Sequence, residues 1–225
     1  MKPWFCMISL WVGTLFARAQ GTVEAMVDYV PTNPSGGSPI YSSIYSSING
    51  PVGWTFQPLM DIDVTALGAF SYIVPGHGNI QIGLWNASGV LMASQSVNSA
   101  SSAVNQSLYS AITPVMLTAG QTYYLAAYSV VGPFSAVVVT PGIEPNGYAT
   151  MSPDIQLGVV AYAANTGFSF PSTTDGNPGF AIIAPNFEFQ PVPEPTGLLG
   201  MACAAAAAWR VRRGNGRAEV REVRR

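Results

Sequence analysis

Residues 61–67 read Asp-Ile-Asp-Val-Thr-Ala-Leu, and polar and apolar residues alternate along them. Because successive side chains of a strand point to opposite faces, this alternation predicts a strand with one buried face. The run continues to residue 74, and further apolar and β-branched runs lie at 52–56, 80–85, 90–97, 107–112, 122–131, 134–140, 155–163 and 180–189. Short strands at this spacing predict an all-β fold, a two-sheet β-sandwich with jelly-roll-like connections.

Two short segments predict tight turns between these strands. Asn86-Ala-Ser-Gly89 and Thr118-Ala-Gly-Gln121 each provide a glycine that tolerates positive φ. No stretch between the two ends of the chain has convincing helical periodicity. We therefore expect the sandwich domain over residues 51–190, after a low-complexity or edge segment over residues 20–50.

The 225-residue chain carries its basic residues only near its two ends. Charged residues make up 9% of it, against about 25% in an ordinary soluble domain. Residues 19–209 contain no lysine or arginine but nine carboxylates. A nucleic-acid partner is excluded, because binding phosphate needs clustered basic side chains. The contrast indicates that the ends are targeting segments and the middle is the working protein.

Residues 1–19 have the pattern of a secretory signal peptide. Lys2 gives the positive start, and an apolar run follows over residues 4–16. Ala17 and Ala19 then provide the small residues that a signal peptidase requires, which makes Gln20 the first mature residue. The predicted partner of this end is therefore a signal peptidase, and the protein is exported.

The other end, residues 191–225, has three consecutive parts. Val192-Pro-Glu-Pro195 forms an extended spacer, residues 197–209 are apolar, and Arg210-Val-Arg-Arg213 follows. Arginines stay on the cytoplasmic side of a membrane, so the domain before the spacer faces outward. The apolar stretch of thirteen residues would span about 20 Å as a helix, less than a hydrocarbon core of about 30 Å. This tail therefore predicts a transient inner-membrane anchor rather than a permanent one.

The complete tail resembles the PEP-CTERM sorting signal of exosortase substrates. The matching positions are Val192, Pro193, Glu194 and Pro195, followed by the cluster Arg210, Arg212 and Arg213. The resemblance implies that a membrane-embedded exosortase-like enzyme recognises the Pro-Glu-Pro box and removes the tail. Residues 214–225 extend beyond the arginines at which this family usually stops. A proline-rich linker before a simple tail anchor remains the alternative interpretation.

Residues 53–128 are similar to a secreted β-sandwich module of undefined function that also occurs in PEP-CTERM proteins. The matching segments are Gly53-Trp-Thr-Phe56, Asp63-Val-Thr-Ala-Leu-Gly68, Ile82-Gly-Leu-Trp85 with Ser88-Gly89, and Leu117-Thr-Ala-Gly120 before Thr122-Tyr-Tyr. This similarity implies a fold and no activity.

Few residues in the middle of the chain offer catalytic chemistry. Residues 19–209 contain no lysine or arginine, and their single cysteine, Cys203, lies in the apolar stretch of the tail. The single histidine, His77, lies between glycines in a predicted loop. Thiol nucleophiles, Schiff bases and arginine clamps are therefore excluded, and we expect no enzyme. A glycosidase that uses two carboxylates remains chemically feasible.

Two kinds of ligand stay open for this domain. Calcium is the only cofactor considered, with weak candidate ligands in Asp61, Asp63 and Asp175. Sugar rings could stack on aromatic side chains if enough of these are exposed. The candidate aromatic residues are Trp54, Trp85, Tyr123, Tyr124, Tyr128, Phe168 and Phe170.

The sequence thus predicts a non-enzymatic exported protein of the cell surface or extracellular matrix, associated with exopolysaccharide and sorted by an exosortase-type system. The alternative function is a secreted glycan-binding protein or a carboxylate-based glycan-active enzyme. A paired Asp/Glu cleft with carboxylates about 5–9 Å apart would favour the enzyme. Carboxylates scattered over a flat or convex sandwich would favour the binding or structural role.

Overall fold

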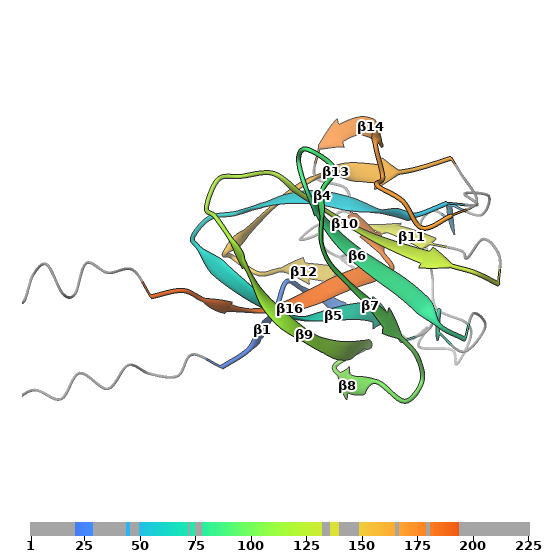
Figure 1. Cartoon of the computed structure of the whole chain (residues 1–225), viewed down its shortest axis with the longest axis horizontal. Coiled ribbons are helices and arrows are strands. Elements are labelled where there is room, and N and C mark those ends of the chain that lie inside the picture. Colours follow the sequence, from blue (N-terminus) through green and yellow to red (C-terminus); the bar gives the residue numbers. More distant parts are fainter. Residues whose placement is uncertain are drawn as a thin grey trace, which may run out of the picture.

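The fold is that of a computed structural model of the chain. It describes residues 21–28, 44–45, 50–71, 73–74, 78–131, 136–139, 149–164, 167–178 and 181–193. Strands form two large antiparallel sheets that face each other (Figure 1). The all-β sandwich predicted from the sequence is therefore confirmed, whereas its jelly-roll connectivity stays a prediction.

The five-stranded sheet contains, in spatial order, β1 (Val23–Glu24), β16 (Pro185–Pro191), β5 (Ile62–Phe70), β9 (Ser107–Leu117) and β8 (Ser102–Val104). The six-stranded sheet contains β14 (Thr173–Pro178), β13 (Ile155–Tyr162), β4 (Val52–Pro58), β10 (Tyr123–Ser129), β6 (Ile80–Asn86) and β7 (Leu91–Val97). Two small sheets complete the described strands: β15 (Ala181–Ile183), β11 (Ala136–Val139) and β3 (Ile44–Tyr45) form one, and β12 (Ala149–Met151) and β2 (Met26–Asp28) form the other.

Strand β5 confirms the alternation from which it was predicted. Ile62 and Val64 are fully buried between the sheets, whereas Asp63 and Thr65 are only half-buried on the outer side. After Thr65 the pairing of β5 with β9 shifts register, and the remainder of β5 is buried on both faces. The Tyr109 ring of the neighbouring strand β9 covers β5 there, since a Cβ on Gly68 would lie 2.3 Å from it.

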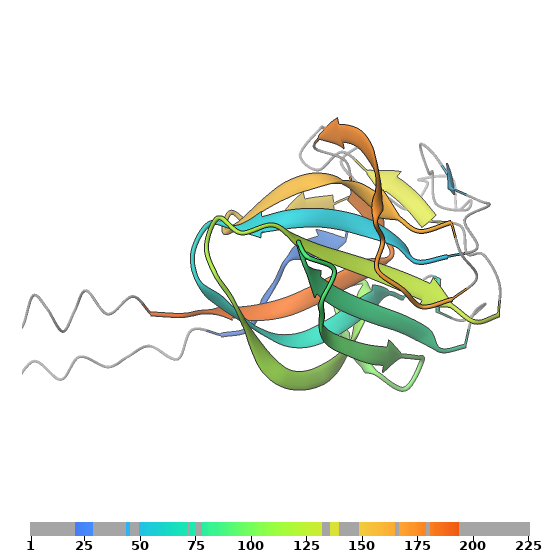
Figure 2. The ribbon, with the colours of Figure 1, turned by 45° about the horizontal axis from the view of Figure 1, so that its top comes forward.

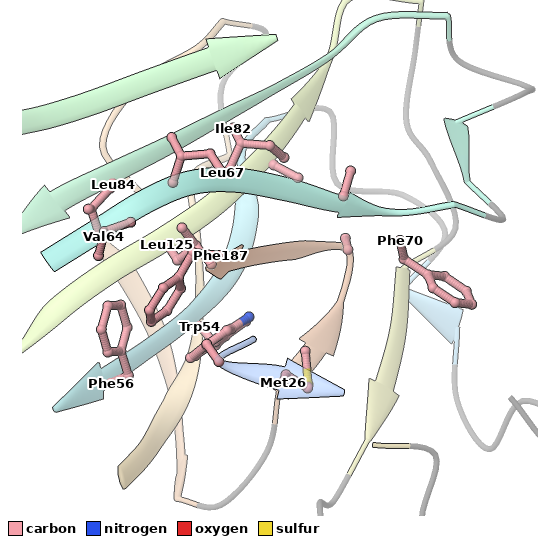
Figure 3. Close-up of a cluster of buried hydrophobic side chains, with 14 of the residues drawn as sticks. Met26, Trp54, Phe56, Val64, Leu67, Phe70, Ile82, Leu84, Leu125 and Phe187 are labelled. Atoms are coloured by element: carbon pink, nitrogen blue, oxygen red, sulfur yellow. The ribbon is translucent and has the colours of Figure 1, made fainter. Parts of the chain in front are cut away.

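Aromatic side chains join the two sheets at the centre of the core (Figure 3). The Phe187 ring on β16 lies 4.8 Å from the Phe56 ring and 6.1 Å from the Trp54 ring, both on β4. The Trp54 indole N–H donates a hydrogen bond to the Pro185 carbonyl oxygen at 3.1 Å. Burying a large apolar side chain contributes about 1.5–3 kcal/mol, so these rings hold the sheets together.

The two predicted turns form as expected. Gly89 has φ of 79°, and the Asn86 side-chain oxygen accepts backbone N–H bonds from Ser88 and Val90 at 3.0 Å each. Gly120 has φ of 71° in the turn between β9 and β10. Positive φ is the conformation that favours glycine, which explains the residue type at both positions.

The strand expected over residues 180–189 is corrected by the structure. It is divided into β15 and β16, which belong to different sheets, with Ala184 between them. The Ala184 carbonyl oxygen accepts a hydrogen bond from the Phe70 N–H at 3.0 Å, at the point where β5 ends. An apolar run does not reveal a change of sheet, because both strands bury apolar residues.

The described chain begins and ends at the same end of the sandwich. Strand β1 pairs antiparallel with β16, and Val23 lies opposite Phe189. Figures 1 and 2 show the start of β1 in blue and the end of β16 in orange-red on the same side of the molecule. Residues before 51 thus contribute strands to the sheets, and β1 is the edge strand of the five-stranded sheet.

Candidate functional site

Only the first residues of the predicted sorting signal lie in the described part of the chain. The Val192 N–H donates to the Asp61 carbonyl oxygen at 2.9 Å, and Pro193 is exposed. The spacer therefore begins directly where β16 leaves the sheet. Ala17, Ala19, Gln20, Glu194, Pro195, Arg210, Arg212, Arg213, His77 and the apolar stretch 197–209 lie outside the described residues. Of those described, none belongs to a helix with the length and apolar character that a membrane span requires.

The candidate calcium ligands do not come together. Asp61 precedes β5, and its side-chain Oδ1 accepts the Ala119 N–H at 2.8 Å, which supports the turn between β9 and β10. Asp63 lies on β5, whereas Asp175 lies on β14 of the other sheet. In the described ranges no three acidic, histidine or cysteine residues are grouped so that they could hold a metal ion.

Two other carboxylates lie directly opposite each other. Glu24 on β1 and Glu188 on β16 are cross-strand partners. The buried Glu24 carboxylate accepts hydrogen bonds from the Tyr109 hydroxyl at 2.7 Å and from the Asn105 amide nitrogen. Burial raises the pKa of Glu188 above its ordinary value of 4.5, and the negative charge of Glu24 raises it further. No local sequence pattern predicts this pair, because the two residues are distant along the chain.

Asn186 connects this pair to the N-terminal strands. Its side chain accepts the Met26 N–H at 3.2 Å and donates to the Met26 carbonyl oxygen at 2.5 Å, as a neighbouring strand would. It also donates to the Tyr109 hydroxyl at 2.7 Å. Asn186 is 1% exposed and Met26 is fully buried. This arrangement holds β2 against the sheet, and we infer a structural rather than a catalytic role for the acidic pair.

The aromatic residues proposed for sugar stacking separate into two groups. Trp54 and Tyr123 belong to the core, so they cannot contact a sugar. Trp85 lies on the outer side of the six-stranded sheet but is only 3% exposed, because the Phe168 ring covers it at 5.2 Å and the Phe170 ring at 6.5 Å. The candidate aromatic residues that remain accessible are half-buried, namely Tyr124, Tyr128, Phe168 and Phe170.

A pocket with both polar and apolar lining residues opens on the outer face of the six-stranded sheet, beside Tyr124, which lies opposite the lining residue Thr55. Its volume is about 200 Å³, and we refer to it as the amide pocket. Gln156 on β13 lies opposite Gln57 on β4. Thr122, the residue directly before β10, continues the row, because its hydroxyl accepts a hydrogen bond from the Gln57 amide nitrogen. The lining residues are Thr55, Phe56, Gln57, Thr122, Gln156, Leu157, Gly158 and Pro178.

A β-bulge accounts for the shape of the amide pocket. Gly158 and Val159 of β13 both lie opposite Thr55 of β4, because the register shifts between Leu157 and Val160. The Thr55 hydroxyl accepts the Val159 N–H at 2.9 Å, which replaces the lost ladder bond. Gly158 cannot carry a side chain, since a Cβ would lie 2.1 Å from the Thr55 hydroxyl oxygen. The bulge thus leaves a hollow on the outer side of β13.

A second, larger hollow of about 600 Å³ lies at the open side of the sandwich, between β7 and β9. The Gln95 amide nitrogen donates to the Ala111 carbonyl oxygen at 3.0 Å and links the two sheets there. The lining residues are Met92, Ala93, Ser94, Gln95, Ala111, Ile112, Thr113, Pro114 and Val115. Neither hollow is lined by an ionisable residue, so neither contains a carboxylate pair suited to glycoside hydrolysis.

A comparison of the chain with models of known protein families finds no match, and a comparison with curated proteins finds none either. The functional argument consequently depends on the residues and their geometry.

Proposed function

We propose that this chain is an exported, non-enzymatic protein of the cell surface or extracellular matrix, associated with exopolysaccharide. A signal peptidase would remove residues 1–19, and an exosortase-type enzyme would process the tail while it is transiently held in the inner membrane. The domain between them would be a sandwich with jelly-roll-like connections. Its mature form would act by binding or by assembly, with no cofactor required.

The observation that supports this proposal is the pairing of β1 with β16. It brings the start and the end of the described chain to the same end of the sandwich. The final backbone hydrogen bond of this end joins Val192 to Asp61, so the Pro-Glu-Pro box follows the folded domain without a long linker. A domain arranged in this way can face away from the membrane while both terminal segments reach it.

We propose no catalysis by the acidic pair. Both oxygens of the Glu24 carboxylate accept hydrogen bonds from Tyr109 and Asn105. Neither Glu24 nor Glu188 lines the two hollows of the sandwich. A general acid and a nucleophile need a cleft that admits a glycosidic bond, and the hydrogen bonds that hold Glu24 support a structural role for this pair instead.

The test is processing of the full chain in a host that contains an exosortase-type enzyme. Replacing Pro193, Glu194 and Pro195 by Ala should leave full-length protein in the inner membrane, whereas the wild type should be shortened and found outside. The control Thr196→Ala, directly after the box, should be processed normally. If wild type and triple variant both keep the C-terminal Arg225 and fractionate alike with the membrane, the tail is a simple anchor and the proposal fails.

The N-terminal cleavage is tested on the same exported material. N-terminal sequencing should find Gln20 as the first residue of the mature protein, because Ala17 and Ala19 fit the peptidase site. An exported form that still begins at Met1 would contradict the signal-peptide interpretation.

A further inference from the structure

The amide pocket carries no charged side chain, and its lining combines hydrogen-bonding groups with a larger share of apolar carbon. Carboxamides and hydroxyls line it, and no ionisable side chain does. The surrounding sequence cannot supply a counter-charge for an anion, because residues 19–209 contain no lysine or arginine. Phosphate, sulfate and uronic acid groups would therefore be desolvated without compensation in this pocket.

The polar groups of the pocket are partly pre-oriented. The Gln57 amide nitrogen donates to the Thr122 hydroxyl oxygen at 3.0 Å, which fixes the orientation of the Gln57 side chain. Its carboxamide oxygen then remains available as an acceptor, and the Thr122 hydroxyl can still donate. Gln156, directly across from Gln57, is exposed and adds a donor and an acceptor. Alternating donors and acceptors of this kind suit the adjacent hydroxyls of a sugar, each of which is both donor and acceptor.

An aromatic side chain lies next to this row on the same face. Tyr124 on β10 lies directly opposite Thr55 of β4, which lines the pocket, so the two side chains are on the same face of the sheet. The Phe170 ring meets the Tyr124 ring edge-on, with centroids 4.8 Å apart, and holds it in place. An apolar ring beside a polar row matches a sugar ring, which has an apolar C–H face and a polar hydroxyl rim.

We propose that the amide pocket and the adjacent Tyr124 ring bind one neutral sugar unit of a polysaccharide. The pocket, about 200 Å³ in volume, is smaller than the sites of about 300–1,000 Å³ that enclose drug-sized ligands, which suits a single ring. The rest of the polysaccharide would extend over the outer face of the sheet. This inference deepens the exopolysaccharide association of the proposed function, and it makes no use of the sorting signal.

The experiment measures binding of soluble neutral polysaccharides (a β-glucan, an α-glucan and a galactomannan) to the full chain. The protein is purified in a detergent without a sugar head group, and binding is followed by affinity electrophoresis and tryptophan fluorescence. Polygalacturonate, an anionic glycan, is the comparison ligand. We expect at least one neutral polysaccharide to bind and polygalacturonate to bind at least tenfold more weakly.

Three single substitutions test the site. Gln156→Ala and Gln57→Ala should weaken binding about three- to tenfold each, which corresponds to the loss of a neutral hydrogen bond, and Tyr124→Ala should weaken it about tenfold. Gln95→Ala is the matched control, because Gln95 is also a glutamine on the six-stranded sheet but lines the other hollow. It should bind like the wild type. Because Gln156 is exposed, its variant should keep the wild-type melting temperature, and so separates binding from folding.

Several outcomes would refute the proposed sugar-binding site. No binding to any neutral polysaccharide would do so, as would equal binding of polygalacturonate. Loss of binding in Gln95→Ala but not in Gln156→Ala would transfer recognition to the hollow between β7 and β9. None of these results bears on tail processing, which the triple Pro-Glu-Pro variant tests separately in cells.

Discussion

The side chain of Asn186 offers the most direct test of how the N-terminal strands are held. In Asn186→Ala, the N–H and the carbonyl of Met26 both lose their partner, and Met26 is fully buried. Each unsatisfied buried group costs about 1–3 kcal/mol, which gives about 2–6 kcal/mol for two groups. Water can enter the vacated space, so we expect about 2–4 kcal/mol, a large part of a typical total of about 5–15 kcal/mol.

The assay is urea unfolding of the full chain in mild detergent, followed by the fluorescence of the buried Trp54 and Trp85. Gln190→Ala is the control on the same strand; Gln190 is exposed, so its variant should stay within about 0.5 kcal/mol of the wild type. Hydrogen exchange at the Met26 amide should also accelerate in Asn186→Ala alone. If Asn186→Ala and Gln190→Ala unfold at the same urea concentration, the side chain does not hold β2 and the reasoning is wrong.

Two more substitutions have expected directions. Gly53→Ala should destabilise the protein by about 1–3 kcal/mol in the same urea assay, because a Cβ would lie 1.8 Å from the Leu125 carbonyl oxygen. Gly167→Ala is its control, because a Cβ at Gly167 would have no neighbouring heavy atom within 4 Å. Burial and the charge of Glu24 raise the pKa of Glu188 above 4.5, so the folded state loses stability as the pH rises through that raised pKa. Glu188→Gln removes the ionisable group and should therefore raise the melting temperature at pH 7.

The pH dependence of the Glu188→Gln effect checks its cause. The wild type recovers stability as Glu188 becomes protonated, so the advantage of the variant should shrink as the pH falls toward 4.5 and below. Melting curves between pH 7 and pH 4 measure this difference. An advantage that grows on acidification would contradict the assignment of the raised pKa to Glu188.

Local sequence pattern predicted the elements whose causes are local. The alternation from Asp61 to Leu67 predicted β5, and Gly89 and Gly120 predicted turns that need positive φ. Strand β14, Thr173–Pro178, lacked any such signal, since it contains Asp, Gly, Asn and Pro. Among the described strands it pairs only with β13, at the edge of its sheet. Its position depends on a partner and not on its own composition.

The candidate site depends even more on long-range register. Gln156, Gln57 and Thr122 are far apart in the sequence and meet only because β13, β4 and β10 pair as they do. The bulge opposite Thr55 adds the hollow, and a bulge cannot be recognised from residue types alone. The sequence did identify the aromatic residues, but the covering of Trp85 by Phe168 and Phe170 requires the position of the loop that carries them.

The side-by-side pairing of β1 and β16 also determines how the protein would respond to force. Hydrogen bonds of an antiparallel pair lie perpendicular to the strands, and Val23 and Phe189 are at the open end of this pair. Pulling the two termini apart would load these bonds one at a time, as in opening a zipper, and would release β1 first. Pulling the C-terminal end of β16 against the opposite end of the sandwich would instead load the bonds between β16 and β5 together, in shear.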